Sequence, residues 1–234
     1  MDGIRDKVIF VTGAAGNLGH AVAKRAIKAG AKVSLTDMLG ETLLQEFPES
    51  ESTMVRIGAD ISEIDSCRTL IAETRSKFGS IDGVISTVGG FAFAPVLDDN
   101  YTTWEHMLTL NLKTAFHVAK ASAEVMRDQR SGAIVLTGAT AALQAPTGVP
   151  AYAASKSGVM RLTESLAEEL KSIGVRVNCV MPSIIDTPQN REAMPNANPD
   201  SWVSPDAVAE VMLFLVSEGA RAVSGALLPV TGKG

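Results

Sequence analysis

The amino-acid sequence predicts an α/β protein built on one doubly wound parallel sheet of about seven strands, with helices on both faces. Two observations favour this class. Short runs rich in β-branched residues alternate with longer helical patterns along the whole chain. Most of the short runs, such as VIFV and AIVL, are apolar on both faces, which is typical of parallel strands covered by helices on each side. Right-handed crossovers then wind the helices over both faces.

The expected elements follow one another in strict alternation. In the fourth helical segment Val159, Leu162 and Leu166 recur at helical spacing. The fifth begins with Pro205 behind Ser204, a typical N-cap pair. The strands are expected at residues 7–12, 32–36, 54–58, 83–87, 133–137, 176–181 and 226–230, and the helices at 17–29, 63–78, 103–127, 151–172 and 205–217.

Composition restricts the class of protein. The 234 residues carry a net charge of −5, which argues against a nucleic-acid surface, because phosphate binding needs a basic face. Cys67 and Cys179 cannot form a disulfide framework. No apolar run reaches the ~18 residues of a membrane span, and the charged N-terminus is unlike a signal peptide. We expect a cytoplasmic single domain, residues 1–234, with no metal site, because the three histidines match no ligand spacing.

A glycine-rich turn lies between the first expected strand and the first expected helix. Gly13 permits a tight turn, Gly16 lets the backbone approach a pyrophosphate, and Gly19 allows close packing of helix on strand. The following helix N-terminus offers free N–H groups to the phosphates. No Gly-Lys-Ser/Thr follows, so the segment is not the phosphate loop of kinases or GTPases. The turn therefore predicts a dinucleotide site.

Acidic residues at the ends of the next two strands indicate which dinucleotide binds. Asp37 ends the second strand, where a carboxylate accepts hydrogen bonds from the adenosine ribose and repels a 2′-phosphate. No Arg or Lys occurs within three residues after it, so NAD(H) is favoured over NADP(H). Asp60 and Ile61 follow the third strand. There Asp60 can form a hydrogen bond with an adenine edge, and the apolar Ile61 can cover it.

Tyr152 and Lys156 lie four residues apart and share one helix face. A free tyrosine has a pKa near 10, too high for proton exchange at neutral pH. The Lys156 ammonium is expected to lower the pKa of Tyr152, which then acts as general acid or base on a substrate oxygen.

These residues, with Asn111, resemble the short-chain dehydrogenase/reductase family in order and spacing, over essentially the whole chain. The resemblance implies a Rossmann-type sheet, a small-molecule substrate and a homodimer or homotetramer. It also implies that Asn111 holds a water in a proton relay from Lys156, and that Thr187 meets the nicotinamide. The expected cofactor-binding residues are Gly13, Gly16, Asn17, Leu18, Gly19, Asp37, Asp60, Ile61, Gly89, Tyr152, Lys156, Pro182, Ile185 and Thr187.

The chain departs from the family pattern in three places. Residues 86–89 read Ser-Thr-Val-Gly where the family has Asn-Asn-Ala-Gly, and Ser183 replaces a glycine. Ala139 stands where the family has its substrate-orienting serine, thirteen residues before the tyrosine. Thr140 is the candidate substitute, and Thr137 is a second hydroxyl nearby, but neither is in register.

Two alternatives to a carbonyl/alcohol oxidoreductase stay open. Residues 136–143 and 186–195 locally resemble quinonoid dihydropteridine reductases, which also lack the serine and use NADH. A non-catalytic NAD(H)-binding protein is the other reading, favoured by Ala139 and opposed by the intact Asn111, Tyr152 and Lys156.

Two further features bear on partners. Phe91, Phe93 and Trp202 are candidates to line a substrate pocket, although aromatic residues at such places are as often plain packing. The helices at 103–127 and 151–172 are expected to form the subunit interface. Small residues at positions 115, 119 and 123 would let another helix approach closely.

Overall fold

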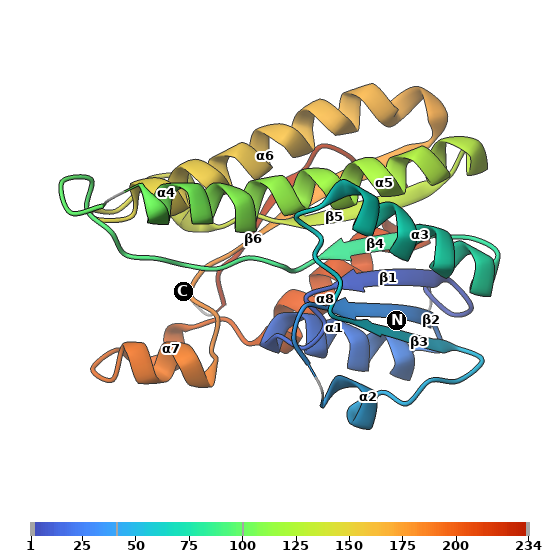
Figure 1. Ribbon diagram of the computed structural model, residues 1–234, viewed down its shortest axis with the longest axis horizontal. Helices are drawn as coiled ribbons and strands as arrows, with labels where there is room; N and C mark the ends of the chain where they lie inside the picture. Colours follow the sequence, from blue (N-terminus) through green and yellow to red (C-terminus); the bar gives the residue numbers. More distant parts are fainter. Residues whose placement is uncertain (1–2, 41, 100, 233–234) are drawn as a thin grey trace.

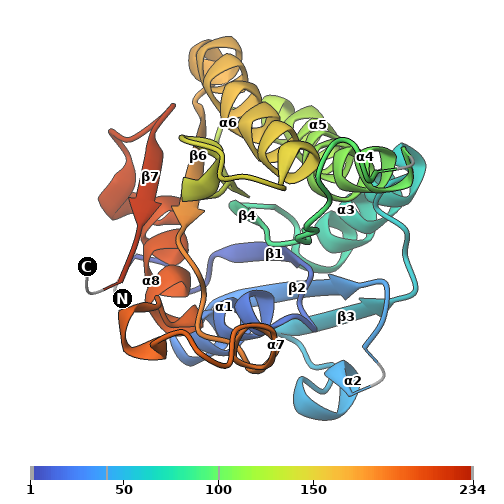
Figure 2. The ribbon, with the colours of Figure 1, turned by 90° about the vertical axis from the view of Figure 1, so that its left-hand side faces the viewer.

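A computed structural model describes residues 3–40, 42–99 and 101–232. It contains one seven-stranded sheet in the order β3-β2-β1-β4-β5-β6-β7, and every neighbouring pair is parallel (Figures 1 and 2). The predicted fold class is confirmed. The strands are β1 (Val8–Thr12), β2 (Lys32–Asp37), β3 (Thr53–Ile57), β4 (Gly83–Ser86), β5 (Gly132–Thr137), β6 (Val175–Pro182) and β7 (Leu227–Val230).

Burial explains why the strand positions were readable from the sequence. All residues of β1 and β4 are buried, and seven of the eight residues of β6 are buried. Strands in the middle of a doubly wound sheet have no solvent face, so they read as continuous apolar runs. Each predicted strand lies within one residue of its observed bounds at either end.

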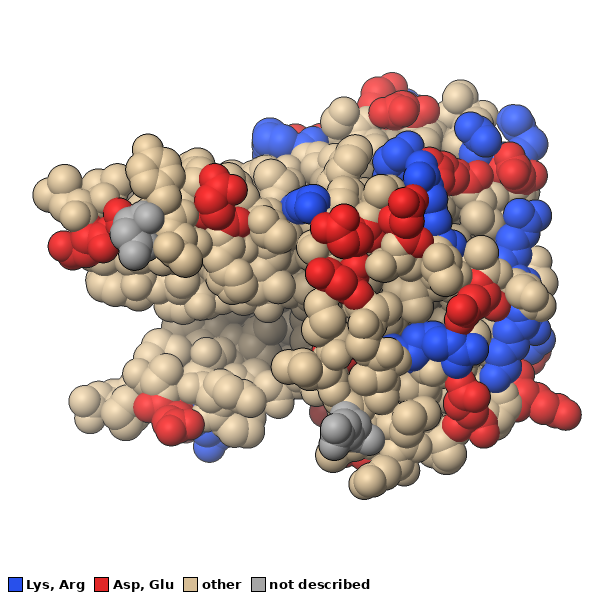
Figure 3. Space-filling model, viewed as in Figure 1, with Lys and Arg blue, Asp and Glu red and all other residues tan. Residues whose placement is uncertain are grey.

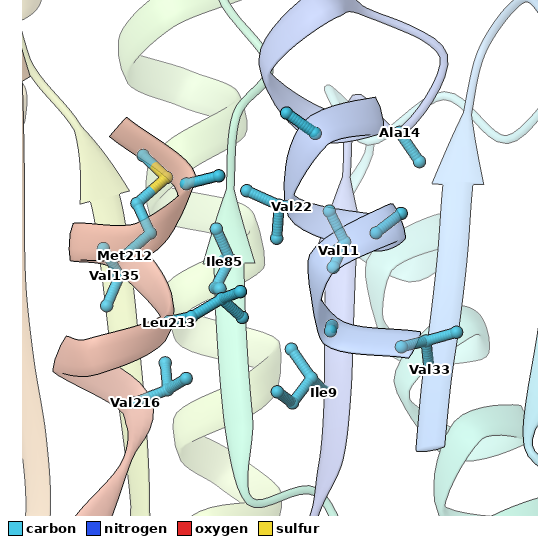
Figure 4. Close-up of a cluster of buried hydrophobic side chains, with 14 of the residues drawn as sticks. Ile9, Val11, Ala14, Val22, Val33, Ile85, Val135, Met212, Leu213 and Val216 are labelled. Carbon is cyan, nitrogen blue, oxygen red and sulfur yellow. The ribbon is translucent and has the colours of Figure 1, made fainter. Parts of the chain in front are cut away.

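Helices cover both faces of the sheet (Figure 2). On one face α1 (Asn17–Lys28) packs against α8 (Pro205–Val216), and Val22 and Leu213 lie over Ile9 and Ile85 of the sheet (Figure 4). On the other face lie α3 (Ile64–Phe78), α5 (Thr114–Gln129) and α6 (Pro150–Leu170). The predicted cap of α8 is confirmed, because the Ser204 side chain accepts a hydrogen bond from the Ala207 N–H.

The segment expected as one helix at 103–127 is interrupted. It consists of α4 (Thr102–Met107), a π-helical turn at Leu108–Lys113, and α5. A π-turn inserts one residue and rotates the side chains around it, and such turns are frequent at functional sites. Asn111 lies in this turn and is buried.

Two short helices escaped prediction, α2 (Leu43–Glu46) and α7 (Pro188–Ala193). Each is too short to show helical periodicity.

The expectation for the alanine stripe was wrong: Ala115 and Ala119 are buried in the subunit's own core, against the sheet, so another subunit cannot reach them. Among the described residues, no helix combines the length and the apolar character that crossing a membrane requires.

Candidate active site

The candidate site lies at the carboxyl ends of the parallel strands, where the strand order reverses between β1 and β4. In open α/β sheets, loops diverge at such a point and leave a crevice for a ligand. Figure 3 shows a deep cleft on this side of the molecule. Its upper lobe is formed by the loop after β4 and by α4, and its lower lobe by α7 (Figure 1).

The glycine-rich turn is packed as the sequence predicts. Gly13 has a φ of +71°, a backbone conformation that favours glycine. A Cβ on Gly19 would fall on the Gly13 carbonyl oxygen, well inside van der Waals contact. Gly16 makes the tight turn, with its N–H donating to the Gly13 carbonyl over 3.1 Å. Neither Gly13 nor Gly19 can therefore carry a side chain without moving the turn.

A cavity of about 530 Å³ opens beside this turn. Thr36 is among the lining residues, and its buried hydroxyl oxygen has no hydrogen-bond partner within the described part of the chain. The glycine turn, the cavity and this hydroxyl fit a dinucleotide coenzyme. The lining of the cavity includes six of the expected cofactor-binding residues, namely Gly13, Gly16, Asp37, Asp60, Ile61 and Gly89.

The two strand-end carboxylates both face the cavity and are held by backbone donors. Asp37 accepts from the Ala15 N–H over 2.9 Å and from the Leu39 N–H over 3.1 Å, which fixes its carboxylate beside the turn. Asp60 accepts from the Ser62 N–H over 2.8 Å, and hydrogen bonding from Ser62 lowers the pKa of Asp60. Both acidic residues therefore line this cavity and are held there by backbone N–H groups.

Tyr152 and Lys156 share the first turns of α6, as predicted. Lys156 is buried and donates from Nζ to the Thr137 carbonyl oxygen over 2.9 Å. Burial lowers the pKa of Lys156 to about 8. The expected lowering of the tyrosine pKa was wrong: burial raises the pKa of Tyr152, because a phenolate is costly to desolvate. In this structure the phenol is held in its protonated form.

The Asn111 side chain is held by hydrogen bonds to Gly90 and Ser155. Its Oδ1 accepts from the Gly90 N–H over 2.9 Å, and its Nδ2 donates to the Gly90 carbonyl over 3.1 Å and to the Ser155 hydroxyl over 2.9 Å. The Ser155 hydroxyl donates in turn to the Tyr152 carbonyl over 2.8 Å. The π-turn is thus tied through Ser155 to the backbone that carries the tyrosine.

Gly89 lies between the side chains of Asn111 and Lys156. A Cβ on Gly89 would lie 2.8 Å from both Asn111 Oδ1 and Lys156 Nζ. This close approach gives a physical reason why the glycine persists although the three residues before it depart from the family pattern.

The Thr137 and Thr140 hydroxyl groups, which lie near Ala139 in sequence, both donate hydrogen bonds to backbone carbonyls. Ala139 is buried and has no donor to offer. Thr140 Oγ1 donates to the Pro182 carbonyl over 3.3 Å, and Thr137 Oγ1 donates to the Ser86 carbonyl over 2.6 Å. Thr140, the candidate substitute, therefore uses its only proton on the protein.

The segment after β6 returns to the glycine-rich turn. Thr187 caps α7, because its hydroxyl oxygen accepts from the Asn190 N–H. Ile185 forms an isolated bridge with Val203. Asn17 Nδ2, at the start of α1, donates to Gln189 Oε1 over 2.9 Å. No local sequence pattern predicts this Gln189 contact, because it joins residues 172 positions apart.

Leu18 is buried in the core beneath the turn. Among the described residues, no group of three or more His, Cys, Asp or Glu side chains is placed to hold a metal ion. Phe91 packs edge-on against Tyr152, with ring centroids 5.0 Å apart, so this candidate pocket aromatic does lie beside the tyrosine.

A doubly wound parallel sheet with a glycine turn and a buried Tyr-Lys pair at its switch point defines a nucleotide-dependent oxidoreductase class. The short chain dehydrogenase family model matches residues 7–198, and the chain belongs to this family. It is 30% identical to L-rhamnose 1-dehydrogenase (NAD(P)(+)) of Azotobacter vinelandii, with 97% of this chain and 96% of that protein covered.

Two solved structures are also similar. Levodione reductase has a TM-score of 0.89 and 27% identity, with 98% of this chain and 97% of that one covered. NAD⁺-bound xylitol dehydrogenase has the same TM-score and identity, with 98% and 99% covered. The family assignment supports an oxidoreductase whose relatives use NAD(P).

Proposed function

We propose that the protein is an NAD(H)-dependent oxidoreductase that interconverts a small carbonyl compound and its alcohol. The observation that carries the proposal is the pair of buried polar side chains, Asn111 and Lys156, that lies with Tyr152 and Gly89 beside the dinucleotide-sized cavity. The relatives named above are oxidoreductases by name, and one is bound to NAD⁺. Oxidation of NADH with a panel of ketones, diketones and a quinonoid dihydropterin tests the proposal.

The coenzyme, when bound, supplies the hydride. Residues of the chain do the rest. The glycine turn and α1 hold the pyrophosphate, and Asp37 holds the adenosine ribose. Tyr152 gives its hydroxyl proton to the substrate oxygen in reduction. The Lys156 ammonium returns a proton to Tyr152, and a water held by Asn111 continues the relay from Lys156. The bond from Asn111 to Ser155 helps to keep the tyrosine backbone in place. The protein thus contributes orientation and a proton.

A quinonoid dihydropterin is the second candidate substrate, because the site lacks the usual second donor. Ala139 has only a methyl group, and the Thr140 proton is bound to Pro182. A substrate that needs one donor suits this arrangement better than one that needs two. A non-catalytic role is the third candidate, and it is supported if no member of the panel is turned over.

The coenzyme preference gives a direct prediction. The Asp37 carboxylate is fixed beside the glycine turn, and neither Met38 nor Leu39 after it offers a cation to a 2′-phosphate. NADH should bind at least about tenfold more tightly than NADPH, which is about 1.4 kcal/mol. Calorimetric titration measures both affinities, and Asp37→Ala should narrow the gap. Equal affinities in the unmodified protein would contradict the assignment.

The pH dependence follows from the buried lysine. Reduction consumes a proton, and Lys156, with its pKa lowered to about 8, carries that proton only below this pH. The kcat/KM for ketone reduction should therefore be level between about pH 6 and 7.5 and fall about tenfold per unit well above pH 8. A profile that stays level to pH 10 would remove Lys156 from the relay. Lys156→Met, which carries no proton, should lower kcat/KM over the whole range and abolish the alkaline fall.

The protein is proposed to form a homodimer or homotetramer through α5 and α6. Its own core uses the alanine stripe of α5, but Phe116 on the same helix is 44% exposed and offers an apolar surface. Light scattering at micromolar concentration should give a mass at least twice 24.5 kDa. Phe116→Asp should weaken the assembly. A monomeric mass for the unmodified chain would refute the proposal.

A further inference from the structure

Three segments form the mouth of the cleft beside Tyr152, and none contains an ionisable acidic or basic residue. They are residues 88–97 after β4, residues 139–151 after β5 and residues 182–185 after β6. Charged residues make up 20% of the whole chain, so their absence from all three segments is unusual. Figure 3 agrees, because the walls of the cleft show no blue or red side chains in this view.

Large apolar side chains are exposed on the same segments. Phe91 and Phe93 are 64% and 66% exposed, and Leu143 and Ile184 are also exposed. Large aromatic side chains seldom stay in water without a partner or ligand to cover them. Phe91 and Phe93, which lie on one loop, are named the mouth patch.

The mouth patch is held in place. The Ala94 N–H donates to the Gly148 carbonyl over 2.8 Å, which ties the loop after β4 to the segment that leads into α6. Phe93 packs directly on Gly148, so closely that a Cβ there would overlap its ring. Phe91 lies edge-on against the Tyr152 ring. The rings are thus a fixed surface next to the proton donor.

The charged residues that directly follow the first and third segments are acidic, namely Asp98, Asp99 and Asp186. Asp186, the first residue after the third segment, forms a two-pronged pair with Arg191, at 2.6 and 2.8 Å. Neither charge is free to hold a substrate carboxylate or phosphate. The three segments themselves offer only hydroxyl and amide groups, and the Thr140 hydroxyl is engaged with Pro182.

We propose that the substrate is an uncharged, apolar ring ketone or the matching secondary alcohol, with its ring against Phe91 and Phe93. This inference rests on the proposed oxidoreductase function and narrows its substrate class. The ketone carbon accepts a hydride, supplied by NADH, and the ketone oxygen accepts the Tyr152 proton, which leaves a secondary alcohol and NAD⁺. The carboxylate of a keto acid has no cation to pair with in these three segments, and a sugar offers hydroxyl groups where the mouth patch is apolar.

The test compares four carbonyl compounds as substrates with NADH: cyclohexanone, the bicyclic ketone decalone, a cyclohexanone carboxylate and fructose. Decalone should have the highest kcat/KM, about tenfold or more above the carboxylate and fructose, because its second ring adds buried apolar surface. Calorimetric binding of the four compounds to the Tyr152→Phe protein with NADH should show the same order of affinity, without turnover.

Variants of Phe91 distinguish a direct contact with the substrate from an effect on folding. Phe91→Ala should raise the KM for decalone about tenfold and leave kcat within about threefold, since the ring acts on binding. Phe91→Leu should restore most of the affinity. Phe214→Ala is the matched control, because Phe214 lies on α8 and is similarly exposed at 48%. It should leave the kinetic constants unchanged.

The outcomes distinguish the two proposals. Tyr152-dependent turnover that favours the carboxylate or fructose over decalone would overturn the substrate class and leave the oxidoreductase function standing. An unchanged KM in Phe91→Ala would also overturn it. No Tyr152-dependent turnover of any carbonyl compound, despite NADH binding, would overturn the function itself.

Discussion

Replacing Tyr152 with Phe should lower kcat/KM for ketone reduction by about 10²- to 10⁴-fold, the usual contribution of a general acid. The change removes one hydroxyl and keeps the ring that packs against Phe91. The phenol is protonated in the structure because burial raises the pKa of Tyr152, so it is poised to donate in the reducing direction. Steady-state kinetics on the best ketone of the panel measures the loss.

NADH affinity is the control for this variant. Tyr152 is not in the lining of the cavity beside the glycine turn, so loss of its hydroxyl should change the dissociation constant of NADH by at most about tenfold, the contribution of one hydrogen bond. A Tyr152→Phe protein that reduces ketones at the original rate would show that the proton comes from another group.

Gly19→Ala should weaken NADH binding roughly 10- to 100-fold. The added Cβ falls on the Gly13 carbonyl oxygen and also lies 2.8 Å from the Thr87 hydroxyl. Because the first contact is backbone, the turn itself has to move, and overpacking of this kind costs about 1–3 kcal/mol. The distorted turn no longer presents its N–H groups to the pyrophosphate.

Gly79→Ala is the matched control for this substitution. Gly79 ends α3 with a φ of +87°, and a Cβ there meets nothing within 4 Å. The variant should lose about 1 kcal/mol of stability from backbone strain, because only glycine adopts this conformation freely. Its NADH affinity should equal that of the unmodified protein. Equal NADH affinity in Gly19→Ala would contradict the proposed role of the turn.

The sheet could be predicted because its signal is strong and local. Ile9, Ile85 and Val135 lie in strands buried on both faces, and such strands read as unbroken apolar runs. Helices α1, α3, α6 and α8 are long enough to show their period. Helix α2 has four residues, and no periodic pattern can show in that length. The π-turn at Leu108–Lys113 has the composition of the helices around it, so its sequence does not distinguish it.

The site could be predicted in its residue types but not in its electrostatics. The spacing of Tyr152 and Lys156 places them on one helix face. The direction of the tyrosine pKa depends on how deeply the ring is buried, which spacing does not reveal. The Asn17–Gln189 bond and the Ser155 link to Asn111 depend on how distant segments meet, and no local pattern encodes that.

The central claim is that this chain moves a hydride onto a carbonyl carbon. Incubation of the protein with a ketone and NADH that carries deuterium on the transferring face of nicotinamide C4 tests it most directly. Mass spectrometry of the product should show an alcohol with one deuterium on the former carbonyl carbon, formed by the unmodified protein and not by Tyr152→Phe. NADH oxidation that leaves no deuterium in the product, with both C4 faces tried, would contradict the account.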